Sequence, residues 1–246
     1  MHTYSGIAFY DEPAIHERYV TARAAADEPN KALEEPFVLQ FLGDVAGCDI
    51  LDLGCGDAAI GRRLLAAGAR SYAGVDGSIL MVDRARAALA GTGGTVSQVD
   101  LEDWRPASES SVDIVLSRMA LHYVADLGRL LGAVRRACRP GGRLVFSVEH
   151  PVVTSSYDAD WDGDVPRVWR VHGYYREGPR SCPWLGARVR KHHRTFETYL
   201  TLLAGSGLRL RGFSEGVPRA AHFADQTVFQ RRLEVPMYVT FHAVAD

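Results

Sequence analysis

The stretch ILDLGCGDAAIG, residues 50–61, decides the fold because a short apolar run leads directly into closely spaced glycines. The apolar run predicts a strand buried on both faces, and glycines after such a strand let a ligand approach the backbone of the turn. Gly54, Gly56 and Ala59 satisfy the dinucleotide fingerprint G-x-G-x-x-G/A. We therefore expect a ligand site in this turn, at the carboxyl end of a central strand.

Acidic residues near this turn indicate which ligand it binds. Asp52 shortly precedes the first glycine, and its carboxylate would repel the two phosphates of a dinucleotide. S-adenosylmethionine (SAM) has no phosphate and carries an ammonium and a sulfonium, which a nearby carboxylate attracts. Asp76 is predicted to end the second strand, where it could accept both ribose hydroxyls of either cofactor. Asp100, which follows the third strand, could accept from the adenine amine, with Leu101 giving a backbone amide to the ring.

These acids also have a structural explanation, because Asp side chains often cap the turns that follow strands. The combination with the D-x-G-x-G pattern favours the cofactor interpretation, since turn capping does not require the glycines. An NAD-dependent dehydrogenase is the weaker alternative.

From residue 48 onward, β-rich runs alternate with segments of helical period, which predicts parallel β-α-β units. The predicted strands are residues 48–54, 71–76, 95–100, 112–120, 143–150, 208–216 and 236–245. The last strand follows the sixth without a crossover helix, so we expect it to run antiparallel near an edge of the sheet. The predicted fold class is α/β and Rossmann-like, with a seven-stranded, mostly parallel sheet.

Helices are predicted where apolar residues recur at helical spacing between these strands. They cover residues 60–68, 79–91, 127–138 and 196–207. Ser78, Asp126 and Thr195 stand where side chains that cap the first turn of a helix are expected. The RPGG sequence at residues 139–142 is expected to end the third helix.

The regular alternation stops at residues 151–194, which are rich in Pro, Gly, Tyr, Trp and Arg and have no sustained period. A connection this long is usually functional, so we expect a substrate cap inserted after the fifth strand. Residues 1–47 are expected to form a helical cover, 48–150 the cofactor-binding core, and 195–246 a carboxyl-terminal helix with a strand hairpin. All four segments are expected to form a single domain.

Composition limits the classes of function. The chain has 246 residues, 47% of them apolar, and a formal net charge of -2, which suits a globular domain without global attraction to nucleic acid or anionic lipid. No apolar stretch approaches the roughly 18 residues of a membrane span, and the amino terminus lacks a signal-peptide pattern. The four cysteines form no C-x-x-C pair. We therefore expect a cytoplasmic protein with reduced thiols.

Several motifs together resemble one family. ILDLGCGDAAIG, YAGVDGS, VDLEDW, VDIVLSRMALHYV and RPGGRLVFSVEHP occur in the order and spacing of class I SAM-dependent methyltransferases, over about residues 48–150. YDEPAIHERYVTAR, WLGARVRKHHRTFETYL and RRLEVPMYV resemble a bacterial subgroup of small-molecule methyltransferases. That subgroup usually has an aromatic residue and a histidine after G-x-G, whereas this chain has Asp57, Ala58 and Ala59. The resemblance implies the class I methyltransferase fold, with SAM as cofactor and S-adenosylhomocysteine (SAH) as its product.

The resemblance also implies where the cofactor binds. Asp52, Gly54 and Gly56 would surround the methionine moiety, and Arg23, in a helix that covers the cofactor in similar enzymes, could pair with the methionine carboxylate. The tyrosines of this helix have core packing as an alternative, and His122 is interpreted as packing of the cofactor pocket. The implied cofactor-binding residues are Tyr19, Arg23, Asp52, Gly54, Cys55, Gly56, Asp76, Gly77, Met81, Asp100, Leu101, Ser117, Met119 and His122.

Methyl transfer is an in-line displacement in which positioning can supply most of the catalysis. A base is needed only when the acceptor must lose a proton. His150 is the predicted catalytic base because it leaves the fifth strand beside the expected site, and Pro151 forces an extended exit. A structural histidine bonded to the backbone is the alternative.

The cap is expected to bind the acceptor, since its basic residues outnumber the acidic ones and alternate with aromatic residues. A solvated surface is the alternative for these charges. The predicted acceptor-binding residues are Tyr10, His150, Trp169, Tyr175, His193 and Arg194. No metal site is predicted: adjacent His192 and His193 do not face one ion together, and DADWDG, residues 158–163, opens like a calcium loop but has Trp169 in place of the required Glu.

We therefore expect an enzyme that moves a methyl group from SAM to an O or N atom of a small-molecule metabolite, with secondary metabolism as one setting. It is expected to act as a monomer or homodimer, without membrane or nucleic-acid partners. The basic aromatic cap is also compatible with a tRNA or other nucleic-acid methyltransferase. A non-methylating SAM-binding protein would carry the same cofactor motifs.

Overall fold

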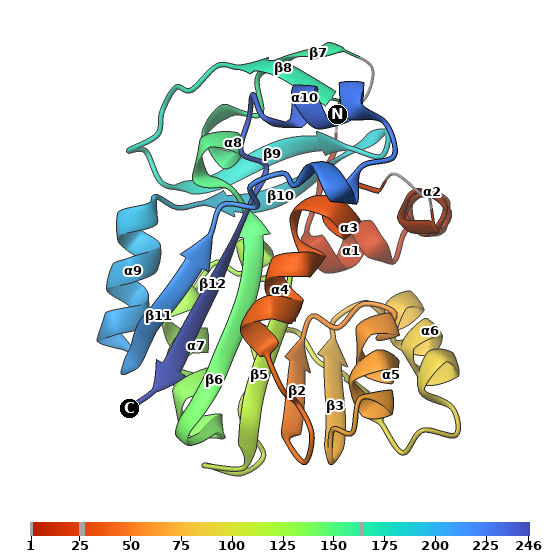
Figure 1. Ribbon diagram of the computed structural model, residues 1–246, viewed down its shortest axis with the longest axis vertical. Helices are drawn as coiled ribbons and strands as arrows, with labels where there is room; N and C mark the ends of the chain where they lie inside the picture. Colours follow the sequence, from red (N-terminus) through yellow and green to blue (C-terminus); the bar gives the residue numbers. More distant parts are fainter. Residues whose placement is uncertain (1, 25–27, 163–164) are drawn as a thin grey trace.

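The computed structural model describes residues 2–24, 28–162 and 165–246, and a seven-stranded sheet lies at its centre (Figure 1). The strand order is β11-β12-β6-β5-β2-β3-β4. These strands are β2 (Asp49–Leu53), β3 (Ser71–Asp76), β4 (Thr95–Gln98), β5 (Val112–Arg118), β6 (Cys138–Glu149), β11 (Leu208–Ser214) and β12 (Tyr238–Ala245). Only β12 runs antiparallel to its neighbours within this sheet of the described chain. The predicted sheet and its antiparallel last strand are confirmed.

Helices cover both faces of the sheet, which explains why its central strands are almost wholly apolar. One face is covered by α4 (Glu35–Leu42), α5 (Ala59–Ala66) and α6 (Ile79–Leu89), and the other by α7 (Leu127–Ala137) and α9 (Phe196–Gly205). Ile114, Val115 and Leu116 of β5 are fully buried, as expected for a parallel strand covered on both sides.

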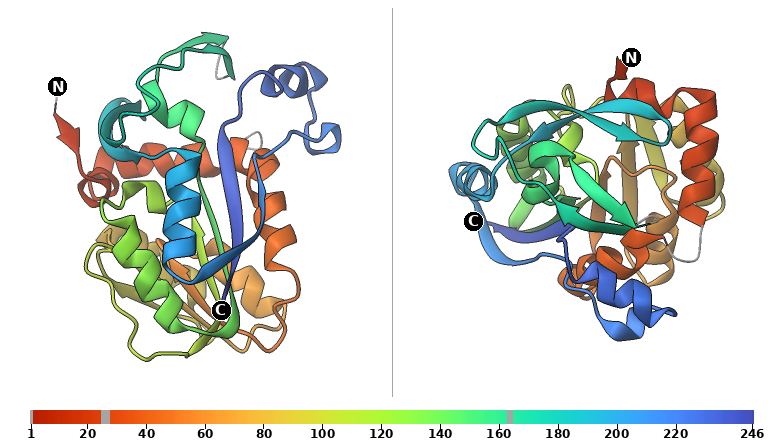
Figure 2. Two further views of the ribbon diagram at one scale, coloured as in Figure 1. Left: turned by 90° about the vertical axis from the view of Figure 1, so that its left-hand side faces the viewer. Right: turned by 90° about the horizontal axis from the view of Figure 1, so that it is seen from above.

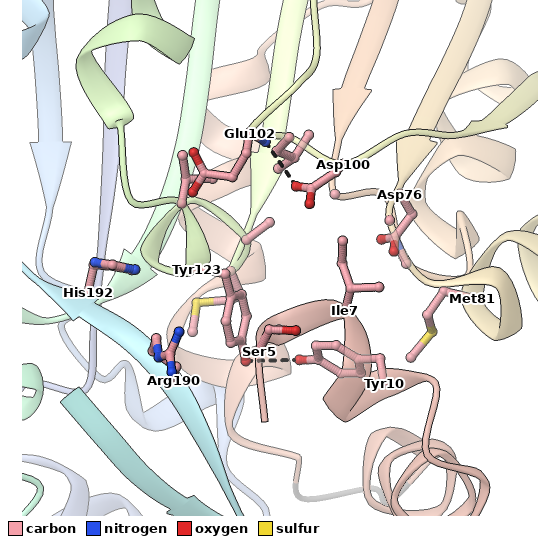
Figure 3. A pocket seen from close by; sticks show the side chains of 18 of the residues that line it. Ser5, Ile7, Tyr10, Asp76, Met81, Asp100, Glu102, Tyr123, Arg190 and His192 are labelled. Carbon is pink, nitrogen blue, oxygen red and sulfur yellow. Dashed lines mark hydrogen bonds between the residues drawn. The ribbon is translucent and has the colours of Figure 1, made fainter. Parts of the chain in front are cut away.

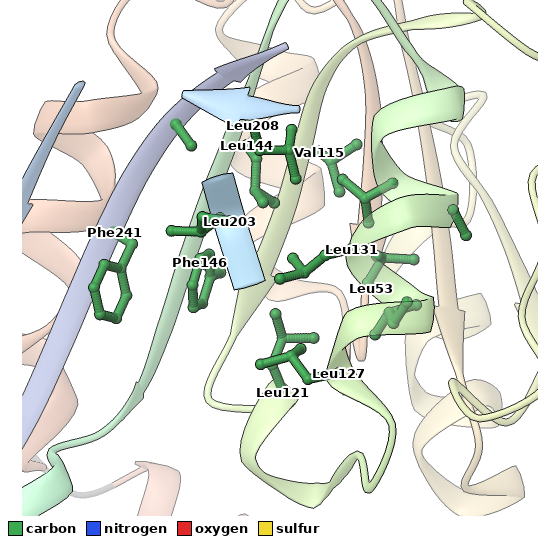
Figure 4. Packing of buried hydrophobic residues seen from close by; sticks show 14 of the residues in the cluster. Leu53, Val115, Leu121, Leu127, Leu131, Leu144, Phe146, Leu203, Leu208 and Phe241 are labelled. Atoms are coloured by element: carbon green, nitrogen blue, oxygen red, sulfur yellow. The ribbon is translucent and has the colours of Figure 1, made fainter. Parts of the chain in front are cut away.

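The larger hydrophobic cluster lies between α7, α9 and the sheet (Figure 4). Side chains from both layers meet there, among them Leu127, Leu131, Phe146, Leu203 and Phe241. The rings of Phe146 and Phe241 stack with their centroids 4.9 Å apart. Burying side chains of this size contributes about 1.5–3 kcal/mol each, so the cluster holds both helices firmly against the strands.

The side chains predicted to cap three helices do so. Those of Ser78, Asp126 and Thr195 each accept a hydrogen bond from the backbone amide three residues further on, at 3.2, 3.0 and 3.2 Å. The RPGG sequence follows the end of α7 as predicted. The chain passes directly into β6 there, so this sequence begins the fifth strand of the sheet instead of forming a loop before it.

The amino-terminal segment contains helices and one short strand. The helices before α4 are α1 (Gly6–Tyr10), α2 (Pro13–Ala24) and α3 (Pro29–Leu33). The strand, β1 (Thr3–Tyr4), pairs in parallel with β10 (Ala187–His193) of the predicted cap. The amino-terminal segment and the cap therefore meet at one end of the molecule, above the carboxyl ends of the parallel strands (Figure 2).

Residues 151–194 contain more regular structure than the sequence predicted. Their elements are α8 (Pro151–Ser156), β7 (Ala159–Asp162), β8 (Val165–Trp169), β9 (Gly178–Trp184) and β10. β7 pairs with β8 and β9 with β10, both antiparallel. Buried and more exposed residues alternate along β10, but the buried ones are Val189, Lys191 and His193. Because two of these three are basic or polar, the sequence shows no alternation of apolar and polar residues.

The DADWDG stretch runs into the paired strand β7. Asp158 and Asp160 accept hydrogen bonds from the Arg170 guanidinium, which occupies their carboxylates. Gly163, the last residue of the stretch, lies outside the described residues.

The connection from β11 to β12 contains η2 (Ala220–His222) and the short helix α10 (Gln226–Arg232), which the sequence analysis did not predict. β11 and β12 still pair directly with each other, so α10 is not a crossover helix. Among the described residues, no helix combines the length and the apolar character needed to cross a bilayer.

Candidate active site

A cavity of about 510 Å³ lies at the carboxyl ends of the central parallel strands (Figure 3). In an open α/β sheet this is where ligands bind. The lining residues come from the amino-terminal segment, the strand ends, the 3-10 helix η1 (Leu121–Tyr123) and the cap. They are Ser5, Gly6, Ile7, Tyr10, Tyr19, Gly54, Gly56, Asp76, Gly77, Met81, Asp100, Leu101, Glu102, Arg118, Met119, Ala120, Tyr123, Val124, Ala125, Pro179, Arg190 and His192.

The glycine turn after β2 forms part of the cavity wall. Gly54 has a φ of +73°, and a Cβ at this position would lie 2.3 Å from the Cβ of Ala120. A side chain here would therefore be both strained and blocked. The amides of Gly54 and Cys55 donate to the Val75 carbonyl at 2.8 and 3.0 Å, which fastens the turn to the neighbouring strand.

Acidic side chains stand at successive strand ends on one side of the cavity. Asp76 accepts hydrogen bonds from the amides of Gly56 and Ser78, both at 2.9 Å. Burial raises the pKa of Asp76 above its ordinary value, while these amide bonds oppose the shift. Asp100 accepts from the Glu102 amide at 2.9 Å. A carboxylate has about four acceptor positions, so both acids can still accept from a ligand.

The amino-terminal segment closes over this acidic side. The Ser78 hydroxyl donates to the Asp11 carboxylate at 2.6 Å, which fastens the end of α1 to the start of α6. Ile7 packs so closely on Gly77 that a Cβ on the glycine would lie 2.5 Å from the isoleucine side chain. The close contact explains why a glycine follows Asp76.

The cap supplies the other side of the cavity. Arg190 and His192 stand across the cavity from Asp76 and Met81 (Figure 3). Burial, followed by the charge of Arg194, lowers the pKa of His192, which favours a neutral imidazole.

Lys191, between these two residues in β10, forms a buried ion pair with Glu149 of β6. The Lys191 ammonium also lies 5.1 Å from the ring centroid of Trp184 and 5.7 Å from that of Tyr123. Burial lowers the pKa of Lys191, but the charge and hydrogen bond of Glu149, together with smaller effects of neighbouring groups, outweigh burial and leave the pKa above its ordinary value. The charged pair therefore ties the cap hairpin to the sheet.

The cavity brings together part of the predicted set of site residues. Those that line it are Tyr10, Tyr19, Gly54, Gly56, Asp76, Gly77, Met81, Asp100, Leu101 and Met119. The predicted residues outside its wall are Arg23, Asp52, Cys55, Ser117, His122, His150, Trp169, Tyr175, His193 and Arg194. Each of these residues is located elsewhere in the fold, with contacts outside the cavity.

Asp52 is buried, and its carboxylate is not part of the cavity wall. The Tyr72 hydroxyl donates to one of its oxygens at 2.6 Å, and the other oxygen has no hydrogen-bond partner within the described ranges. Burial raises the pKa of Asp52 to about 7. The Ser117 hydroxyl donates to the Leu53 carbonyl at 2.6 Å, and the Cys55 thiol is buried. These three side chains belong to the segments that form the cavity wall, but they do not line the cavity themselves.

Arg23 pairs with Glu28 at 2.7 Å and does not line the cavity. The arginine at the strand-end side of the cavity is Arg118, which the sequence analysis missed. Arg118 is ion-paired with Glu34 and Glu35 of the amino-terminal segment. The sequence position of Arg118 could have indicated this, because it lies between Ser117 and Met119, two predicted site residues at the end of the fourth strand.

His150, the predicted base, is not among the residues that line the cavity. One ring nitrogen accepts from the Val152 amide at 3.1 Å and caps α8, while the other is bonded to the Glu215 carboxylate at 3.0 Å. The backbone of His150 is extended, with φ -61° and ψ 141°, as Pro151 requires. His150 is the structural corner that the sequence left as the alternative.

Two further histidines are also structural. His122 is buried, and burial lowers its pKa to about 3. His193 is bonded through its ring to the Thr154 hydroxyl and the Tyr174 carbonyl, each at 2.7 Å. His193 was predicted to bind the acceptor, but the next residue before it, His192, is the one that lines the cavity. Neighbouring residues of a strand point to opposite sides, so only one of the two histidines can face the cavity.

The remaining cap residues also lie outside the wall. The Arg194 guanidinium donates to the carbonyls of Val124 and Ala125 at 2.6 and 2.8 Å. Tyr175 is 88% exposed, and Trp169 belongs to the outlying β7–β8 hairpin. Tyr175 therefore lies on the exposed surface of the cap.

The fold has close counterparts among known proteins. A solved SAM-dependent methyltransferase from Mesorhizobium loti is 36% identical to this chain, with a TM-score of 0.79, and the match covers 91% of this chain and 99% of that one. The chain belongs to the SAM-dependent methyltransferases. A methyltransferase-domain model matches residues 51–146 of this methyltransferase, the segment with the glycine turn and the strand-end acids. The predicted family, enzyme class and cofactor are confirmed.

Two other relatives extend beyond that segment. An uncharacterised protein of Haemophilus influenzae is 28% identical over 218 residues, covering 85% of this methyltransferase and 86% of that protein. The trans-aconitate 2-methyltransferase of an Azoarcus species is 28% identical over 178 residues, covering 72% of this methyltransferase and 68% of that protein.

The chemistry of the cavity wall fits SAM. Its strand-end side carries the carboxylates of Asp76 and Asp100, while Arg118 there is already paired with Glu34. Such a side suits a ligand with ribose hydroxyls and two cationic groups. It suits the phosphates of a dinucleotide poorly, because they would meet these carboxylates.

Proposed function

We propose that this methyltransferase moves a methyl group from SAM to an oxygen or nitrogen atom of a small molecule. The observation that carries the proposal is the single cavity of about 510 Å³, whose wall includes both the acidic strand ends and the cap. Sites for small molecules have volumes of about 300–1,000 Å³. Because both reactants must meet inside this space, an acceptor of metabolite size is favoured over a macromolecule.

The strand-end side is assigned to the cofactor. Asp76 would accept from the ribose hydroxyls and Asp100 from the adenine amine, with the Leu101 amide directed to the adenine ring. Gly54 and Gly56 line the cavity without side chains and leave room for the methionine moiety. The cofactor supplies a methyl group on a sulfonium, which is an excellent leaving group.

The cap side is assigned to the acceptor, and His192 takes the place of His150 as the group that can accept a proton. The lowered pKa of His192 favours the neutral imidazole. A general base needs this form, because one of its ring nitrogens is free to accept a proton. An alcohol or amine acceptor loses a proton on methylation, so a neutral histidine at this position would assist. Acceptors that need no proton removal would depend on positioning alone.

The direct test is SAH release from SAM in the presence of fractionated small-molecule metabolites, with purified tRNA as a separate arm. SAH release with a small-molecule fraction and none with tRNA is the expected result. Release with tRNA alone would support a nucleic-acid methyltransferase instead. Tight SAM binding without release in any arm would support the non-methylating alternative.

The cofactor assignment has its own test. Asp76→Asn removes a charged acceptor, so SAH binding should weaken by about 1.5–3 kcal/mol. Asp83→Asn is the matched control, because Asp83 is an exposed residue of α6 outside the cavity. Calorimetric titration with SAH measures both variants, and equal affinities would contradict the role of Asp76.

A further inference from the structure

Arg190 differs from the other cations around the cavity. Arg118, which also lines the cavity, is ion-paired with Glu34, and Lys191 is ion-paired with Glu149. Over the described parts of the chain, the Arg190 guanidinium has neither an ion pair nor a hydrogen bond. Arg190 is exposed and lines the cavity, so its permanent positive charge reaches the cavity without being used in an ion pair.

The position of Arg190 places this charge away from the cofactor side. Arg190 and His192 stand on one side of the cavity, and Asp76 and Met81 stand on the other, with Tyr123 between them (Figure 3). The two cationic groups of SAM favour the side with the carboxylates. The side with Arg190 is left for the second reactant, and its charge favours an anion.

Much of the remaining wall is apolar or weakly polar, with Val124, Pro179 and Met119 among its residues. The Glu102 carboxylate also lines the cavity, and its charge acts on His192. The Tyr123 hydroxyl is hydrogen-bonded to that of Tyr10 at 3.1 Å, so each already has a partner. A ligand on this side would meet a largely apolar surface with one cation at its edge.

We propose that the acceptor carries an oxyanion, a carboxylate or a phosphate ester, on an apolar body, and that Arg190 binds this oxyanion. The inference rests on the proposed function, because it names the substrate class of the same site. The guanidinium offers a planar fork of donors that matches two oxygens of such a group. His192 lies beside the anchor, and the methyl-accepting atom of the acceptor points to the acidic side of the cavity, where the cofactor is assigned.

The test uses the full chain saturated with SAH and three probes that share one ring: benzoate, phenyl phosphate and benzamide. Propionate and propionamide form a second pair without a ring. Each anion should bind about tenfold or more tightly than its neutral counterpart, as measured by ligand titration with NMR detection. The relative affinity of benzoate and phenyl phosphate distinguishes a carboxylate from a phosphate ester.

Two variants test whether Arg190 is responsible for the preference for anionic ligands. Arg190→Gln should abolish it while leaving the melting temperature and SAH affinity unchanged, because Arg190 has no internal partner to lose. Arg84→Gln is the matched control: Arg84 is an exposed arginine of α6 that does not line the cavity, and this variant should keep the preference.

Three results would overturn the inference: equal binding of anions and amides, a preference that survives in Arg190→Gln, or no anion binding at millimolar concentrations. SAH affinity is measured first and tests the proposed function separately. A protein that did not bind SAH would contradict the proposed function, whereas normal SAH binding without anion preference would contradict only the role of Arg190.

Discussion

The two sides of the cavity are built in opposite ways. The cofactor side consists of Gly54, Asp76 and Asp100, which follow successive strands of one parallel sheet. The acceptor side takes Arg190 and His192 from a cap hairpin whose place depends on contacts between distant parts of the chain. The comparison teaches that a site built on strand ends is visible in local sequence, whereas a site built on one face of an inserted strand is not.

Lys191→Met would break the connection between the two sides and has the largest expected effect. Loss of the buried ammonium leaves the carboxylate of Glu149, whose side chain is only 16% exposed, without its ion-pair partner, which should lower the free energy of unfolding by about 3 kcal/mol. Urea unfolding measures the loss. The double variant with Glu149→Gln should recover part of the stability. If it were no more stable than the single variant, the ion pair would not be the link between cap and sheet.

Gly54→Ala tests the cofactor side at its tightest point. The new Cβ would meet Ala120 and sit at a φ of +73°, so strain and overpacking together should lower the free energy of unfolding by about 2–4 kcal/mol. SAH affinity should fall as the turn shifts. Gly91→Ala is the control, since Gly91 has a φ of +77° with open space around its Cβ. Thermal unfolding and SAH calorimetry should show a clearly larger loss for Gly54→Ala; equal losses would mean that the contact with Ala120 is unimportant.

Asp52→Asn tests the buried carboxyl behind the cofactor side. Burial raises its pKa from 3.8 to about 7, so the folded protein holds this proton more tightly than the unfolded chain. The resulting stabilisation is present below about pH 3.8 and is lost as the pH rises through about 7. The variant cannot titrate, so its stability relative to wild type should increase from about pH 5 to about pH 8, by on the order of 2–3 kcal/mol. Urea unfolding at both pH values measures this, and a constant difference would show that Asp52 does not titrate there.

His150→Ala has the smallest expected effect and tests the acceptor side. Loss of the α8 cap should lower the free energy of unfolding by about 0.5–2 kcal/mol. Turnover at saturating substrate should change little, because His150 lies outside the cavity. His192→Gln is the comparison, and with an acceptor that loses a proton it should reduce turnover by about 10²-fold or more. A large loss of turnover in His150→Ala alone, with normal folding, would restore His150 as the base.

The sheet could be predicted because its signals are local. Each central strand is a short apolar run next to a helix with a recognisable cap, such as Ser78 or Asp126. The strand-end acids Asp76 and Asp100 followed from the same order, since parallel strands bring their carboxyl ends to one edge. The ten predicted residues that line the cavity come from this core and from the helices before it.

The cap could not be predicted in the same way because its buried positions are polar. Lys191 and His193 occupy the inner face of β10, and their burial depends on Glu149 and Thr154, which are distant in sequence. A basic strand without a hydrophobic alternation resembles an exposed loop. The sequence therefore predicted that the cap contributes to the site, but it selected His193, whereas His192 is the residue that lines the cavity.

The sequence alone was sufficient to predict the α/β fold, the SAM-dependent methyltransferase family and the acidic residues at the strand ends, because glycine turns and strand-end carboxylates have fixed places relative to a strand. Only the tertiary structure decided that Arg190 and His192 face the cavity and that His150 caps a helix outside it. Those positions depend on the pairing of β10 with β1 and β9 and on a buried ion pair with β6. Contacts of this kind join residues far apart in the chain, and the spacing of residues along the sequence does not record them.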